Sequence, residues 1–234
     1  EVRKAVREQL KADADAIKCM ATGGVLTTGA QTGAPELTPT ELAALVETAH
    51  TAGRSTAAHC HGTQGIKNAV QAGIDSVEHG TFMDEEGAEM MAERDTYWVP
   101  TLSALKGIVE NSDAGIPEQA VAKGEEAGQR MAAAWEHALD AGVPIAMGTD
   151  AGTPFNDHAD AAHELAYMVE YGLDEAGALE AATVNAADLL GLDDTGMIEK
   201  GYRADLLVLP ENPLEDVRAW QSPAQVFLGG EQVR

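Results

Sequence analysis

The sequence predicts an α/β fold in which strands and helices alternate and the strands pair in parallel. Short apolar runs alternate with longer amphipathic stretches along residues 1–190. Strand–helix–strand repetition favours parallel pairing through right-handed crossovers. The apolar character of the runs fits a sheet that is buried on both faces. Strands are expected at residues 14–21, 55–61, 76–79, 97–102 and 143–149.

The amphipathic stretches between these runs predict helices, and several have typical ends. Thr38 and Pro39 precede an acidic first turn at Glu41, which is a typical helix start. Glycine follows other stretches at Gly73 and Gly142, which is a typical helix stop. The expected helices are residues 2–11, 40–52, 63–72, 84–94, 117–141, 158–171 and 173–190.

Two architectures fit this order, a doubly wound open sheet and a closed barrel. A Gly-x-Gly-x-x-Gly motif does not follow the first strand, which argues against a dinucleotide-binding fold. Polar residues stand at the carboxyl ends of several strands, where barrel enzymes carry their chemistry. Residues 191–234 lack helical periodicity, and the turn Gly229-Gly230 follows an apolar run. The pattern therefore favours a barrel portion over 1–190 and a small β unit over 191–234.

Amino-acid composition excludes some classes of binding partner. The 234 residues include 15 Lys and Arg against 39 Asp and Glu, for a formal charge of −24. Nucleic acids and anionic membranes need a basic surface, so neither is an expected partner. The charge is typical of proteins from a very salty cytoplasm, although an ordinary acidic protein is the alternative. A signal-peptide core is missing at the start, and two cysteines are too few for a disulfide scaffold. We expect a cytoplasmic homo-oligomer.

Five polar residues stand at or near strand ends: Lys18, His59, His61, His79 and Asp150. Because side chains alternate along a strand, His59 and His61 share a face while Cys60 points away. Imidazole nitrogens and a carboxylate from different strands are typical ligands of zinc or a similar divalent ion. Each residue also has a structural alternative. A strand histidine can be a core residue, Asp150 can cap a helix, and Lys18 can pair with a carboxylate or reach solvent.

Five segments together resemble the amidohydrolase superfamily. They are residues 17–24 (IKCMATGG), 58–62 (AHCHG), 77–80 (VEHG), 148–150 (GTD) and 196–206 (GMIEKGYRADL). Within the superfamily they are most similar to the imidazolonepropionase-related group, which contains Xaa-Pro and Xaa-Arg dipeptidases (prolidase-like) and ochratoxin-type amidases. The resemblance implies a (β/α)8 TIM barrel, a small β-sandwich built from both chain ends, and a binuclear centre that usually holds zinc.

Carried over by position, the resemblance assigns a role to each polar residue. Lys18 matches the lysine that becomes N-carboxylated and bridges the two metals, and His59 and His79 match ligands of one metal. Asp150 matches the aspartate that binds metal and shuttles the catalytic proton. His61 is expected to contact substrate. Carboxylation would replace the ammonium of Lys18, which is costly to bury in an apolar strand, with an anionic ligand.

One departure from the family is clear. The family's first strand ends in His-x-His, and here the only such motif, His59-Cys60-His61, matches the fifth strand. The predicted strands thus match strands four to eight only, and we expect the C-terminal part of a longer enzyme. The expected domains are residues 1–190, a barrel portion, and 191–234, part of the β-sandwich.

The predicted function is a metal-dependent amidohydrolase that cleaves a C–N bond by metal-activated hydroxide. A dipeptide is the first substrate hypothesis, and hydrolysis of an imidazolone or another cyclic amide is the alternative. The loops 27–33 and 101–103 are expected to shape the pocket. The rival from another class is a non-catalytic, truncated remnant that acts through a partner chain.

Overall fold

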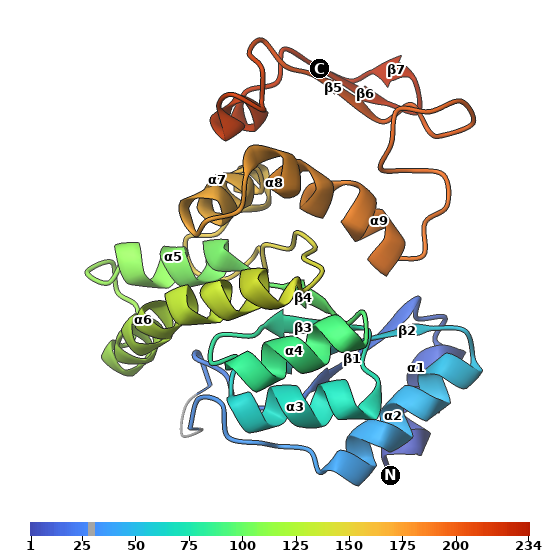
Figure 1. Cartoon of the computed structure of the whole chain (residues 1–234), viewed down its shortest axis with the longest axis vertical. Helices are drawn as coiled ribbons and strands as arrows, with labels where there is room; N and C mark the ends of the chain where they lie inside the picture. Colours follow the sequence, from blue (N-terminus) through green and yellow to red (C-terminus); the bar gives the residue numbers. More distant parts are fainter. Residues whose placement is uncertain (28–30) are drawn as a thin grey trace. The chain divides into compact units, whose positions relative to one another are not determined.

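A computed structural model of the chain describes residues 1–27 and 31–234 (Figure 1), so part of the predicted pocket loop 27–33 lies outside the described residues. The α/β expectation is confirmed by a parallel sheet with helices between its strands. The strands are β1 Ala16–Met20, β2 Ser55–Cys60, β3 Ser76–His79 and β4 Tyr97–Val99. The helices are α1 Val2–Lys11, α2 Pro39–Thr51, α3 Thr63–Ala72, α4 Glu85–Glu93, α5 Leu102–Glu110, α6 Glu118–Ala141, α7 His163–Glu170, α8 Glu175–Ala182 and α9 Val184–Leu189.

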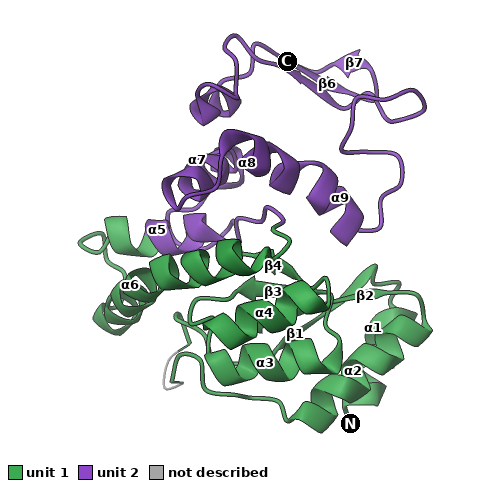
Figure 2. Cartoon of the chain, in the orientation of Figure 1, with its two compact units in different colours: residues 1–100, 108–145 green, residues 101–107, 146–234 purple. Residues whose placement is uncertain are grey.

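The chain separates into two compact units (Figure 2). One comprises residues 1–100 and 108–145, and the other comprises 101–107 and 146–234. The domain boundary expected after residue 190 stays a prediction. Among the described residues, no helix combines the length and the apolar composition needed to cross a membrane.

The first unit is built on the four-stranded sheet, in the order β1-β2-β3-β4. Residues paired in register on neighbouring strands share a face of the sheet. Helices α2 and α3 pack on the face that carries Cys19, Ala58, Val77 and Trp98. These residues are buried, apart from the half-buried Cys19. The opposite face carries Lys18 and Met20, His59, and Glu78 from successive strands. The sheet therefore has one helix-covered, apolar face and one polar face.

Local sequence signals explain where the helices start and end. The predicted start of α2 is confirmed, since Thr38 and Glu41 form a reciprocal capping box with Pro39 in the first turn. Gly73 and Gly142 end α3 and α6 in the left-handed conformation that glycine adopts readily. The indole rings of Trp98 and Trp135 meet at 4.8 Å between centroids and anchor α6 to the sheet.

The prediction of a strand at 143–149 is wrong. Only Ile145 forms a bridge, to Trp98, and the N–H of Trp98 donates to Pro144 O at 2.8 Å. Pro144 cannot donate in return. The N–H of Met147 donates instead to Ala181 O of α8 at 2.8 Å, so the chain leaves the sheet for the second unit. The expected strand 97–102 likewise ends early, because Leu102 begins α5.

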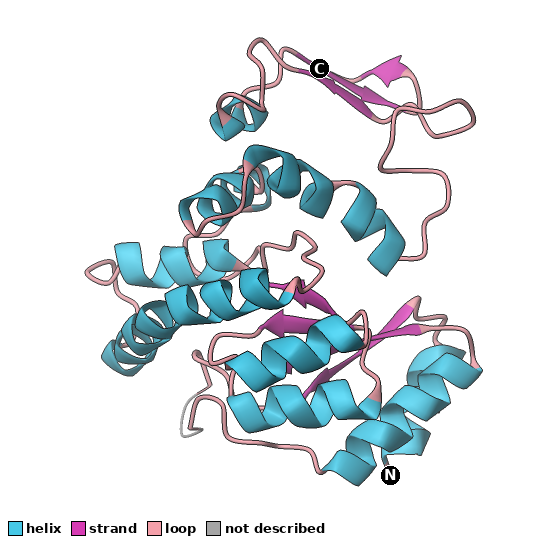
Figure 3. Cartoon of the chain, viewed as in Figure 1, coloured by secondary structure: helices cyan, strands magenta, loops and turns pink. Residues whose placement is uncertain are grey.

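The second unit contains helices and a small antiparallel sheet (Figure 3). Its strands are β5 Leu206–Val208, β6 Gln225–Leu228 and β7 Glu231–Gln232, with short 3-10 helices at His158–Asp160 and Val217–Gln221. The helix predicted at 158–171 is interrupted after the first of these. The helix predicted at 173–190 breaks at Thr183, whose backbone is non-helical and whose hydroxyl donates to Leu179 O at 2.6 Å. The predicted strand and Gly-Gly turn at the end of the chain are confirmed.

Candidate metal centre

Three histidines of the first unit form one cluster. His59 lies on β2, His61 directly follows β2, and His79 ends β3. Each offers a ring nitrogen, and these atoms all lie within 4.8 Å of one another. The ring centroids of His59 and His61 are 4.7 Å apart, as the alternation of side chains predicted. The sequence therefore placed two of the three correctly on one face.

His79 joins the cluster through its backbone. The register pairs His79 with Cys60, on the helix-covered side of the sheet. His79 adopts φ +70°, which turns it away from the ordinary alternation. Its ring lies 4.5 Å from that of His59 and stacks on that of His61 at 4.8 Å. The indole N–H of Trp98 donates to His79 O at 2.9 Å and holds this turn.

Burial sets the charge state of the cluster. It lowers the pKa of His59 to about 4 and that of His61 to about 3. It also lowers the pKa of His79 well below the usual value, with smaller contributions from His61, His59 and Lys18. The three imidazoles are therefore neutral at pH 7 and keep lone pairs for a cation.

The hydrogen bonds of the ring nitrogens fit a bound cation. His59 Nε2 is buried and has no hydrogen-bond partner within the described residues, and such a polar atom is costly unless a ligand satisfies it. His61 Nδ1 lies 2.8 Å from the hydroxyl of Thr81, which orients the ring in the manner of the partners around metal sites. A Cβ at Gly24 would lie 3.1 Å from His59 Nε2, so the loop after β1 also approaches this nitrogen closely. These residues fit a divalent metal ion.

Lys18 shares the polar face with His59, since the register pairs Met20 with His59 and Lys18 with Ala57. Its charge contributes to the lowered pKa of His59, after burial. The side chain is exposed, however, on the edge strand β1 of this sheet. The ammonium therefore does not carry the burial cost that the sequence suggested. The role of Lys18 as a bridging ligand stays a prediction.

Asp150 belongs to the second unit, where it is exposed and adopts φ +53°. Residues 151–157 form a bridge, turns and irregular chain rather than the start of a helix, so the alternative that Asp150 caps a helix is wrong. The amide of Asn156 donates to the carbonyl of Asp150 at 3.0 Å. Its metal-binding and proton-transfer roles stay predictions.

The sequence reasoning missed the residues that support the histidines. Thr81 and Trp98 are buried and contact His61 and the His79 carbonyl. Thr22 accepts the backbone N–H of His61 at 2.9 Å. A polar residue two places after His79 was a weak signal for Thr81. Nothing in the spacing pointed to Trp98, because its indole reaches the site from the next strand.

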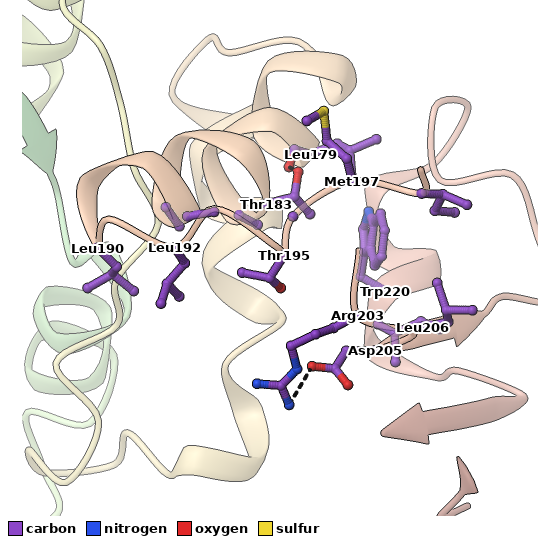
Figure 4. Close-up of a pocket in the computed structure, with 16 residues that line it drawn as sticks. Leu179, Thr183, Leu190, Leu192, Thr195, Met197, Arg203, Asp205, Leu206 and Trp220 are labelled. Carbon is purple, nitrogen blue, oxygen red and sulfur yellow. Dashed lines mark hydrogen bonds and ion pairs between the residues drawn. The ribbon is translucent and has the colours of Figure 1, made fainter. Parts of the chain in front are cut away.

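A pocket of 530 Å³ lies elsewhere, within the second unit (Figure 4). Its wall is mainly apolar and includes Leu179, Leu190 and Met197, with Trp220 on another side. Arg203 and Asp205 form an ion pair there at 3.2 Å. The described residues that line it include no histidine or cysteine, so this pocket differs in chemistry from the histidine cluster.

Comparisons with known proteins point to one family. Residues 1–233 match the model of the amidohydrolase family. Ochratoxinase from Aspergillus niger is 38% identical over 239 residues, which cover 99% of this chain and 48% of the relative. Imidazolonepropionase from Deinococcus deserti is 33% identical over 154 residues, covering 65% of this chain and 34% of the relative.

A solved structure is also similar to this chain over its whole length. The crystal structure of a Xaa-Pro dipeptidase with bound methionine in the active site superposes with a TM-score of 0.93 at 39% identity. The superposition covers 100% of this chain and 58% of that one. The chain thus spans about half the length of these two proteins. The predicted resemblance is confirmed, and the chain belongs to the amidohydrolase family.

Proposed function

We propose that this chain carries the metal-binding part of a divalent-metal-dependent hydrolase that cleaves a carbon–nitrogen bond. The observation that carries the proposal is the cluster of His59, His61 and His79, whose ring nitrogens lie within 4.8 Å of one another. Their lowered pKa values keep them neutral, and His59 Nε2 lacks a protein partner among the described residues. In a cluster with only a structural role, the buried and unpaired His59 Nε2 would be a cost without a compensating bond.

The residues divide into roles as follows. His59 and His79 would hold the metal, with zinc favoured by the imidazole donors. When bound, a divalent ion polarises a substrate carbonyl and lowers the pKa of water. Lys18, as a carbamate, would bridge to a second metal in the binuclear arrangement of the family. Asp150 would accept a proton from water and pass it to the leaving nitrogen. His61, whose ring Thr81 orients, would contact the substrate carbonyl.

A dipeptide is the proposed substrate. One similar structure is described as a Xaa-Pro dipeptidase and one relative as ochratoxinase. Hydrolysis of a cyclic amide is the second candidate, favoured by the likeness to imidazolonepropionase. We propose a small-molecule substrate in either case, in a cytoplasmic homo-oligomer.

The proposed architecture is the C-terminal portion of a TIM barrel, with β1 to β4 at strand positions four to seven and the single bridge of Ile145 at position eight, and part of a β-sandwich at the end of the chain. Two exposed surfaces support it. On the polar face of the sheet, Met20 is 48% exposed beside the exposed Lys18. In the C-terminal sheet, Leu207, Val208 and Leu228 are exposed. Further strands that pack on these surfaces would bury them. A segment preceding residue 1 or a partner chain can supply such strands.

Metal content tests the proposal. We expect the purified protein to bind zinc, to lose amide hydrolysis after chelation, and to regain it with zinc. His59→Asn should weaken zinc binding by about 10- to 100-fold or more, while His137→Asn on α6 serves as a control outside the cluster. Equal zinc affinity in all three proteins would exclude this metal centre.

Asp150→Asn separates the enzyme from the non-catalytic remnant. An enzyme should lose nearly all turnover, because the carboxylate moves the proton. Zinc binding without hydrolysis of any dipeptide or cyclic amide would instead favour the remnant.

A further inference from the structure

The loop after the segment 143–149 is organised around one buried asparagine. Asn156 is 4% exposed. Its side-chain amide donates to Thr149 O at 2.7 Å, to Asp150 O at 3.0 Å and to the hydroxyl of Thr153 at 3.0 Å. Its own backbone carbonyl accepts the N–H of Gly152 at 2.8 Å. One residue therefore closes the loop through both its side chain and its backbone.

These contacts act on both sides of Asp150. The carbonyl of Thr149 belongs to the peptide plane before Asp150, and the carbonyl of Asp150 belongs to the plane after it. The dihedrals φ and ψ of Asp150 relate these two planes, and together they set the direction of its Cα–Cβ bond. By holding both carbonyls, the amide of Asn156 keeps Asp150 at φ +53°, a conformation that is uncommon for residues with a Cβ, although aspartate adopts it more often than most.

The loop also packs tightly on its neighbour. A Cβ at Gly107 of α5 would lie 2.6 Å from Pro154 O, so only glycine lets the helix approach the loop this closely. The hydroxyl of Thr153 donates to Asp150 O at 3.0 Å, which adds a more exposed contact to the same carbonyl. The loop thus has a rigid support, and the amide of Asn156 is its buried centre.

We propose that Asn156 is a positioning residue that sets the orientation of the Asp150 carboxylate for proton transfer. This rests on the proposed function, because it needs Asp150 to be the proton-transfer group. The amide acts through the backbone and does not need to touch the substrate. The chemical requirement is an N–H donor at this place, which a carboxylate of the same shape cannot supply.

Asn156→Asp tests whether an N–H donor is required here, since it keeps the size of the side chain and removes both N–H donors of the amide. In the zinc-loaded full-length protein, we expect Asn156→Asp to lower kcat about 10- to 100-fold, as for other groups that orient a catalytic residue. KM should change less than about threefold, because uniform binding of substrate is untouched. In the Asp150→Asn background the substitution should cause no further loss, because both changes act on one group.

Two controls accompany it. Thr153→Val removes both contacts of the Thr153 hydroxyl but leaves the bonds from the Asn156 amide to Thr149 O and Asp150 O, so it should cost far less than Asn156→Asp. Asn212→Ala removes an exposed asparagine from the same unit and should leave kcat unchanged. Hydrogen exchange of residues 149–156 gives a readout that does not need turnover, and Asn156→Asp should accelerate it.

The outcomes separate this proposal from the proposed function. If Asp150→Asn abolishes turnover but Asn156→Asp retains full kcat, Asn156 does not position Asp150 and only this proposal is wrong. Turnover that survives Asp150→Asn would overturn the role of Asp150 and, with it, the positioning role. If the unsubstituted protein has no turnover, the proposed function fails. Unchanged exchange in Asn156→Asp would then show that the amide does not hold the loop.

Discussion

Three residues with a side chain adopt left-handed backbone conformations where strands or strand-like segments end. They are His79 at φ +70°, Thr101 at φ +53° and Asp150 at φ +53°. Such conformations are disfavoured for residues with a Cβ and concentrate at functional sites. At His79 the result is visible, because the turned backbone brings the ring to the other two histidines. A backbone change at one residue, His79, is therefore enough to bring a third histidine ring to the cluster.

Gly80→Ala should disrupt the turn that holds His79. Gly80 has φ +61°, and a Cβ there would collide with the indole nitrogen of Trp98. Gly53 has φ +67° with open space around it, so Gly53→Ala carries the backbone cost of about 1 kcal/mol without a collision. We expect Gly80→Ala to lower Tm more than Gly53→Ala and to weaken zinc binding. Calorimetry and zinc titration measure both, and equal effects of the two substitutions would contradict this account.

At the scale of elements, α7 fixes the start of α5. Glu164 is completely buried, and its carboxylate accepts three hydrogen bonds. They come from the N–H of Leu102 at 2.7 Å, the N–H of Ser103 at 2.7 Å and the hydroxyl of Ser103 at 2.6 Å. The carboxylate thus satisfies two N–H groups that a helix leaves unpaired at its start. Burial nevertheless raises the pKa of Glu164 to about 7, against the lowering effect of these donors.

This carboxyl group should make stability depend on pH. Between its ordinary pKa of 4.5 and about 7, the folded protein holds a proton that the unfolded chain has released. The contribution of Glu164 to stability therefore decreases as pH rises through this window. Relative to Glu164→Gln, the natural protein should lose up to about 1.4 kcal/mol for each pH unit. Urea unfolding from pH 5 to pH 8 tests this.

Glu180→Gln, an exposed change on α8, is the matched control and should show the pH dependence of the natural protein. A constant difference in unfolding free energy between the natural protein and Glu164→Gln would mean that Glu164 does not titrate in this range.

At the scale of the whole molecule, the net negative charge is the feature that most affects stability. The formal charge of −24 on 234 residues destabilises the compact state through self-repulsion. Salt shortens the Debye length from about 10 Å at 0.1 M to about 3 Å at 1 M. We expect Tm to rise steeply between these KCl concentrations and to level off above them. An uncharged osmolyte serves as the control, because it stabilises without screening. A Tm that is insensitive to KCl would count against adaptation to high salt.

The sequence predicted most of the first unit. Its strand positions, its helix order and the capping of α2 at Thr38 follow from local periodicity and end signals. The shared face of His59 and His61 follows from alternation along one strand. The segment 143–149 was mispredicted because its apolar composition fits either a strand or a buried connection. Its partner, the carbonyl of Ala181, is distant in sequence.

By itself, the sequence determined the family, the α/β class and the shared face of His59 and His61, since these depend on residue types at short spacings. Only the tertiary structure decided that His79 turns into the cluster, that Glu164 holds α5 and that Asn156 holds Asp150. The physical reason is that each depends on a hydrogen bond or a backbone dihedral set by packing. Trp98 reaches the His79 carbonyl from the neighbouring strand, and Glu164 reaches Ser103 from 61 residues away. Such contacts leave no periodic trace in the chain.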